Sequence, residues 1–246
     1  MTDTVIAAET RTTQLVYRPL LRAMSQTGLA ALASGLLSAI GIKMIAAVGG
    51  PAALATLSTL QQLRQAAVVA ATGNGQTALV QGASALAGVE RSEYVRTVAC
   101  WFAAAISLVA GVMILWPRLV TALAGFGPGA IPMIPWLAVP VALTSWLVFS
   151  GALLTALGAI GRLAVLSVIA SAAMAFGAWP AAWAFAGGER RALVALLIFS
   201  SAVSAGAALV VLASFRERIE EWFRGPGRWW SGRAFRSFSM MSGALL

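Results

Sequence analysis

The sequence predicts an all-α membrane protein with six transmembrane helices and the start of a seventh. Hydrophobic residues make up 60% of the 246 residues and charged residues only 10%, whereas soluble domains hold about 45–50% and about 25%, respectively. Mostly apolar stretches of about 20 residues, enough for one helical crossing, recur along the chain with short interruptions. The alternating segments of about 10 residues that are typical of membrane barrels are not seen. The spans are therefore expected to be helical.

The amino-terminal third should form a surface arm and a helical hairpin. Residues 1–27 are polar and end in the amphipathic stretch LVYRPLLRAM, which we expect along the cytoplasmic membrane surface. The first span, about 28–48, should end at Gly49-Gly50-Pro51, because glycine tolerates a tight turn and proline suits the first position of a new helix. The second helix should extend to about Gly82, and Gly73, Gly75 and Gly82 let it bend or pack closely. Its unusual polarity makes it the main clue to function.

Four more spans are expected, at about 97–116, 136–157, 163–185 and 192–213. The charged loop GVERSEYVR before the first of them should lie in water, and the proline- and glycine-rich region 117–135 should be the least regular. Residues 214–236 should form an interfacial amphipathic linker, whose apolar face holds Phe215, Ile219, Trp222 and Phe223. Residues 237–246 begin another apolar run that is too short for a crossing, so we expect the start of a truncated seventh span.

Basic residues predict how the lobe is oriented. Arginines of the amino-terminal arm, of the charged loop and of the linker all fall on one side of the predicted spans, whereas Arg118, Arg190 and Arg191 fall on the other. Lys and Arg are enriched in cytoplasmic segments, so both ends of the six-span lobe are expected in the cytoplasm. The net charge of +9 is explained by this orientation, and nucleic-acid binding is not expected.

The residue types present argue against an enzyme. The chain has one cysteine and no histidine, so neither an internal disulfide nor an ordinary zinc or haem site is expected. Acidic residues occur only in the amino-terminal arm, the charged loops and the segment after the last span, and no glycine-rich phosphate loop with its lysine is found. We therefore expect no catalytic residues, no metal and no cofactor.

Arg64 is the strongest candidate for a functional residue. It follows Pro51 by thirteen residues, which is roughly 20 Å along a helix and therefore near the middle of the bilayer. A charged side chain there costs about 2.5–3.5 kcal/mol on insertion scales, so Arg64 should face protein or a watery cavity. Gln61, Gln65 and Gln76 fall at helical spacing about the same face. The second helix should therefore present a polar stripe with one positive charge.

Lys43, near the outer end of the first span, has two interpretations. Its ammonium group either snorkels to the outer surface or adds a second positive charge beside Arg64. The glutamines likewise either join neighbouring helices or contact a ligand. No acidic residue within the spans can neutralise the two bases, so the pattern predicts an anionic ligand, with candidate substrate-binding residues Arg64, Lys43, Gln61, Gln65 and Gln76. The serines and threonines of the last three spans most often bond back to their own helices, and no role is assigned to them.

Two stretches resemble a known family. KMIAAVGGPAALATLSTLQQLRQAAVVAATGNGQTALVQ and LLTALGAIGRLAVLSVIAS look like the first hairpin and the junction of spans four and five in the polysaccharide transporters, the O-antigen and lipid-linked oligosaccharide flippases of the multidrug/oligosaccharidyl-lipid/polysaccharide superfamily. The resemblance implies one lobe of a two-lobed flippase that moves a polyprenyl-pyrophosphate-linked oligosaccharide across the bacterial inner membrane by alternating access. It also implies a positively charged central cavity, to which Lys43 and Arg64 would belong.

The chain departs from that family pattern in two ways. It supplies one lobe only, so the resemblance implies a missing second lobe or a second chain as partner, besides membrane lipids and the anionic lipid-linked oligosaccharide. Gln81 stands where relatives often have a basic residue.

Two alternative functions stay open. A multidrug exporter of the same superfamily would favour acids in its cavity for coupling cations, and none is present in the spans. A non-transporting membrane scaffold or assembly partner would need no ligand.

Overall fold

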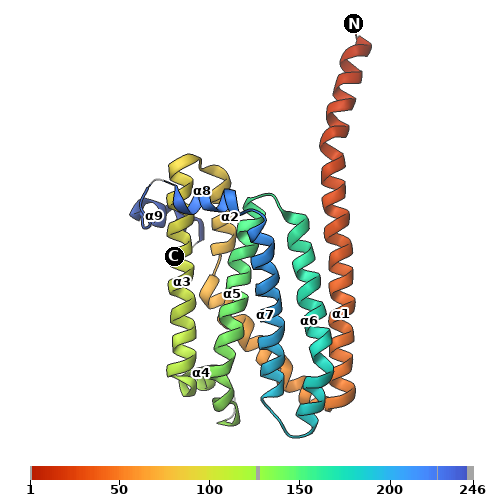
Figure 1. Cartoon of the computed structure of the whole chain (residues 1–246), viewed down its shortest axis with the longest axis vertical. Helices are drawn as coiled ribbons and strands as arrows, with labels where there is room; N and C mark the ends of the chain where they lie inside the picture. The colour runs from red at the N-terminus through yellow and green to blue at the C-terminus, as the bar shows by residue number, and fades with distance from the viewer. Residues whose placement is uncertain (1, 126–127, 226, 243–246) are drawn as a thin grey trace.

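The computed structural model describes residues 2–125, 128–225 and 227–242, with side chains described within 25–125, 131–225 and 227–240. The described residues form helices and contain no strand. Figure 1 shows the long helices packed side by side as a bundle. Five segments of the described chain are long and apolar enough to cross a membrane, namely 25–85, 88–115, 131–156, 160–186 and 192–213. The fold is that of an α-helical, multi-pass membrane protein.

The predicted turn between the first two spans is present at Gly50. Helix α1 (Thr2–Thr72) includes this residue, whose φ of 70° and ψ of −173° break the helix in a conformation that glycine adopts without a Cβ clash. In Figure 1 the first arm of α1 descends along one edge of the bundle, and the second arm turns back toward α2. Gly73, also at positive φ, separates α1 from α2 (Gly75–Ala85). The break falls at Gly73, one of the three glycines that were expected to let this helix bend or pack closely.

The expected surface arm differs from what is found. Residues 2–27 continue the helix of the first span, and in Figure 1 this end of α1 projects beyond the rest of the bundle. A separate arm lying along the membrane would need a turn before the span. The first positive-φ residue in the described chain is Gly50, so the helix continues through Gly28 without such a turn.

The charged loop expected at 88–96 is also different, because it is helical and partly buried. Helix α3 (Gly88–Leu115) includes these residues and runs on through the expected span. Tyr94 is buried and donates its hydroxyl hydrogen to the carbonyl oxygen of Ala78 at 2.8 Å. Its ring occupies the space where a side chain at position 82 would stand, and Gly82 leaves that space open. This contact extends the packed part of α3 toward its amino-terminal end.

The remaining long helices agree with the predicted spans. The irregular region holds a short helix α4 (Pro117–Leu123) and a 3-10 helix η1 (Pro128–Met133), with 126 and 127 outside the described residues. Helices α5 (Ile134–Ala156), α6 (Ile160–Ala186) and α7 (Ala192–Ala213) follow. Their ends lie within about three residues of the expected ones, because long apolar runs limited by glycine and charged turns mark a span clearly.

The predicted linker folds across one end of the bundle. Helix α8 (Arg216–Arg224) lies over the ends of neighbouring helices in Figure 1, and the predicted apolar face packs against the bundle with Trp222 buried. Gly225 directly follows α8, and its carbonyl oxygen accepts a hydrogen bond from the NH1 nitrogen of the buried Arg96 of α3 at 3.1 Å. The Arg96 guanidinium carbon also lies 5.7 Å from the ring centre of Trp229. The linker is thus fastened to α3.

Helix α9 (Gly232–Ser242) occupies the start of the expected seventh span. It begins earlier than the predicted Ser237 and packs against α2 and α3. Phe238 is fully buried, with its ring centre 5.0 Å from that of Trp101. Residues 243–246 lie outside the described residues, so the seventh span stays a prediction.

The apolar core consists of two clusters separated along the bundle. One cluster lies toward Gly50 and includes Leu57 and Leu197, and the other lies toward α8 and includes Leu154 and Ala208. Along α7, residues 200–204 lie between the two clusters and are mostly serine. The middle of the bundle is therefore more polar than either end.

Candidate functional site

A polar cavity lies at this middle level, between the two apolar clusters. Its volume is about 240 Å³. Both arms of α1 and helices α5, α6 and α7 form its walls, with polar lining residues Ser38, Gln61, Arg64, Thr144, Ser171, Ser200, Ser201 and Ser204. No acidic residue is among the described residues that line it. The charge of the described wall is therefore positive.

Arg64 provides that charge. The turn at Gly50 returns the second arm of α1 through the bundle, and this places Arg64 at the level of the cavity. Its Nε atom is buried and has no hydrogen-bond partner among the described residues, and the ion pairs found among described side chains involve other arginines. A buried charged group without partners is unfavourable in isolation. The cavity is therefore suited to a ligand that brings acceptor atoms or negative charge.

Gln61 is the second polar group from the same helix. Residues three apart on a helix are neighbours on one face, so Gln61 and Arg64 both reach the cavity. The Gln61 side-chain amide can donate two hydrogen bonds and accept others. Together the two side chains offer donors suited to an anion on one wall of the cavity.

The opposite walls carry hydroxyl groups. Thr144 and Ser201 lie with their hydroxyl oxygens 3.3 Å apart, and either can donate to the other, so one of the two hydrogens stays available. Ser200 and Ser204 donate to backbone carbonyl oxygens of their own helix, at 3.2 and 2.6 Å. They therefore present acceptor lone pairs to the cavity. The lining thus combines donors for an anion with acceptors for water or a hydroxyl group.

The structure brings together two of the five predicted site residues. Gln61 and Arg64 line the cavity, whereas Lys43, Gln65 and Gln76 are exposed and lie outside its lining. Gln65 follows Arg64 by one residue, which turns it about 100° around the helix. Lys43 lies on the first arm of α1 and is exposed there.

Sequence reasoning assigned no role to the serines and the threonine of the cavity, although Ser200 and Ser204 do bond to their own helix as expected. Ser38 also belongs to a row of small residues along which the first arm of α1 packs against α6. Its hydroxyl donates to that of Ser171 at 3.5 Å, and Ser34 and Ser167 pair one turn away at 3.3 Å. The matching spacing of four residues on both segments was the available signal, because small residues at that interval favour close helix packing in membranes.

Comparisons with known proteins give no match. No family model matches the chain, and neither a curated protein nor a solved structure matches it significantly.

Proposed function

We propose that the chain forms one lobe of a transporter that moves a polyprenyl-pyrophosphate-linked oligosaccharide, such as an O-antigen or exopolysaccharide repeat unit, across the bacterial inner membrane by alternating access. The observation that carries this proposal is Arg64, a guanidinium group in a polar cavity within the bundle whose buried Nε has no partner among the described residues. Arginine binds phosphate oxygens through several charge-assisted hydrogen bonds. The pyrophosphate of such a substrate is the anion that we assign to this cavity.

In this proposal the lobe crosses the membrane six times. The longest apolar segment, 25–85, has 61 residues, about three times the length of a single crossing. Because it reverses direction at Gly50, we count its two arms as two spans. The end that carries α8 and the start of α1 then faces the cytoplasm, as the positive-inside pattern predicts.

The size of the cavity limits what it can hold. At about 240 Å³ it is smaller than the roughly 300–1,000 Å³ of pockets that enclose a drug-sized ligand. It can receive a phosphate group but not an oligosaccharide. The sugars would therefore lie outside the lobe, beside the second arm of α1.

The exposed face of the second arm of α1 is polar, which supports a protein partner packed against this face. Ser58, Gln62 and Gln65 are exposed and recur at three- and four-residue intervals, so they form one stripe along the helix. Polar groups at mid-bilayer rarely face lipid and more often face protein or a watery space. We assign this stripe to the boundary with a second lobe, supplied by the same polypeptide or by another chain.

Binding of a defined lipid tests the anion site. The purified chain in detergent is titrated with undecaprenyl pyrophosphate and, separately, with the neutral undecaprenol, and complexes are counted by native mass spectrometry. We expect saturable binding of the pyrophosphate lipid and a loss of about 10- to 100-fold in affinity for Arg64→Gln, the range for hydrogen bonds to a charged group. Arg64→Lys should retain part of the affinity, because it keeps the charge but not the forked geometry.

Gln65→Ala is the matched control, since it removes an exposed polar side chain next to Arg64 and should leave binding unchanged. Equal binding of the two lipids by the parent chain would contradict the transporter proposal and favour a membrane scaffold. Undiminished binding by Arg64→Gln would place the anion elsewhere.

A further inference from the structure

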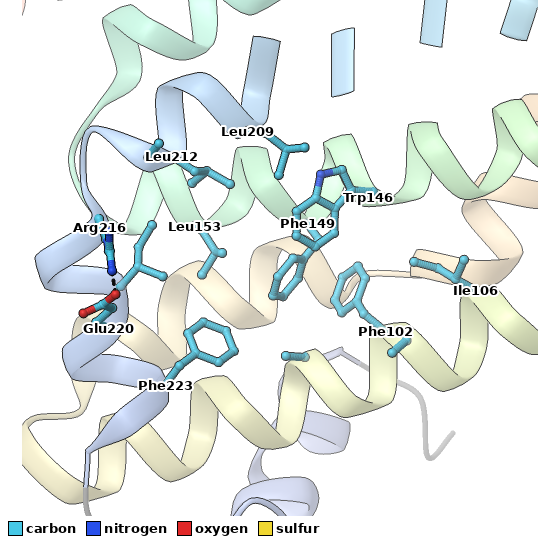
Figure 2. Close-up of a pocket in the computed structure, with 14 residues that line it drawn as sticks. Phe102, Ile106, Trp146, Phe149, Leu153, Leu209, Leu212, Arg216, Glu220 and Phe223 are labelled. Carbon is cyan, nitrogen blue, oxygen red and sulfur yellow. Dashed lines mark hydrogen bonds and ion pairs between the residues drawn. The ribbon is translucent and has the colours of Figure 1, made fainter. Parts of the chain in front are cut away.

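A second cavity, distinct from the polar one, lies beneath α8. It has a volume of about 410 Å³ and is formed by α3, α5, α7 and α8. Figure 2 shows the rings of Phe102, Phe149 and Phe223 gathered around it, with Arg216 and Glu220 at one end. Among the described residues that line it, these two are the charged ones. The cavity is an apolar groove with a charged mouth.

The groove has the direction and depth of a lipid tail. From Leu153 to Trp146 its wall extends about 10 Å along α5 at 1.5 Å per residue, most of the roughly 15 Å of one hydrocarbon leaflet. Leu209 on its rim is 54% exposed, and Ala103 is exposed as well. In a bilayer such a rim borders hydrocarbon, and an apolar space of this size does not hold ordered water.

At the mouth of the groove one carboxylate is paired with two arginines. Glu220 pairs with Arg216, whose Nε lies 2.7 Å from Oε1, and with Arg224, whose NH1 lies 3.4 Å from Oε2. The side chains of both arginines are 74% exposed. Arg162, from the start of α6, lies beside the same end with its guanidinium carbon 4.4 Å from the ring centre of Phe215. Two guanidinium groups thus pair with the Glu220 carboxylate, and a third, that of Arg162, lies beside the neighbouring Phe215.

We propose that this groove binds one acyl chain of an anionic phospholipid of the surrounding bilayer, with the lipid phosphate at Arg216. The apolar walls hold the chain, and the arginines select the charge of the headgroup. This site is independent of the transport proposal, because it requires only that α3, α5 and α7 cross a membrane.

Quenching of Trp146 fluorescence tests the site. The chain is reconstituted in phosphatidylcholine vesicles with a rising fraction of phosphatidylglycerol that carries bromine at mid-chain, or of phosphatidylcholine brominated in the same way. The signal of Trp146 is the difference between the parent and Trp146→Phe. One basic residue near anionic lipid contributes about 1 kcal/mol, so we expect half-quenching at about fivefold lower fractions of the brominated phosphatidylglycerol.

Two pairs of variants make the result decisive. Arg216→Gln should weaken the preference for phosphatidylglycerol, whereas Arg218→Gln, on the same helix but outside the groove lining, should keep it in full. Ala103→Phe should fill the groove and reduce the quenching of Trp146, whereas Ala104→Phe, beside it on α3, should not. Equal quenching by the two lipids in the parent chain, or an equal loss in Arg216→Gln and Arg218→Gln, would overturn the proposal.

Discussion

The hydroxyl oxygens of Thr144 and Ser201 lie 3.3 Å apart and join α5 to α7 at the level of the polar cavity. This is the level at which the two apolar clusters of the core stop. Apolar packing holds the bundle together at either end, and hydrogen-bonding groups face one another in between. Both the charge of Arg64 and the space for a ligand are found there.

A double-mutant cycle measures the link between these two helices. We expect Thr144→Val and Ser201→Ala to be coupled by about 0.6 kcal/mol, the mean for hydrogen bonds between membrane helices. The measurement is reversible unfolding of the purified protein in mixed micelles. Thr155, whose hydroxyl bonds to Gly151 of its own helix at 2.8 Å, provides the control. Thr155→Val should show no coupling to Ser201→Ala, and equal coupling would contradict a direct bond.

Arg64→Met is predicted to stabilise the isolated chain. The substitution keeps a long side chain but removes a charge that has no partner at Nε, and central arginines are unfavourable by about 2.5–3.5 kcal/mol on insertion scales. We expect a higher unfolding temperature in detergent, together with loss of binding to the pyrophosphate lipid. Arg118→Met, at an exposed position of α4, should show no comparable gain. A destabilised Arg64→Met would mean that Arg64 holds the bundle together instead.

Gly82 and Gly111 should respond in opposite ways to alanine. A Cβ at position 82 would collide with the ring of Tyr94, and overpacking of this kind destabilises a core by about 1–3 kcal/mol. At position 111 a Cβ would meet nothing within 4 Å, so alanine should stabilise α3 by up to about 1 kcal/mol through its higher helix propensity. Thermal unfolding of both variants checks the sign of each effect. Loss of stability in the Gly111→Ala variant as well would contradict the open space at that position of α3.

Arg96→Gln should release the linker from α3. Besides its bond to the Gly225 carbonyl, the Arg96 side chain donates Nε to the carbonyl oxygen of Ser92 at 3.1 Å. Such a charged hydrogen bond contributes about 1.4 kcal/mol or more, so its loss would raise the population of molecules with the linker detached from α3 about tenfold. Trypsin cleavage after Arg228 should accelerate accordingly, because proteolysis tracks the open population when opening is fast. Arg118→Gln should leave that rate unchanged, and an unchanged rate in Arg96→Gln would show that other contacts hold the linker.

The helices were predictable to the extent that apolar length alone defines them. Residues 192–213 form α7 as expected, because a run that must cross hydrocarbon is limited at both ends by polar sequence. The start of α3 was not predictable in this way. It depends on Tyr94 fitting against Gly82, and no periodicity reveals such a contact between two separate segments.

The sequence predicted how deep in the membrane the site lies, but not how the helix that carries it is rotated about its axis. Counting from Pro51 places Arg64 at mid-span, and the structure puts it in the polar middle of the bundle. Which glutamine accompanies it depends on how the helix is turned about its axis, and one residue corresponds to 100°. Gln61 and Gln65 therefore could not be distinguished until neighbouring helices were in place. The hydroxyl groups of Thr144 and Ser201 come from helices whose facing sides are fixed only by packing.

The small-residue contact between the first arm of α1 and α6 also implies an order of assembly. Ser34 and Ser38 meet partners that come 133 positions later in the chain. At about 5–20 residues per second of synthesis, the first arm waits roughly 7–27 s in the membrane before α6 is made. The second arm of α1, which is synthesised directly after the turn at Gly50, is the first helix that can cover Ser34 and Ser38 before α6 is made. A ribosome that pauses before α6 would prolong the time in which the two arms of α1 stand in the membrane without this partner helix and are open to degradation.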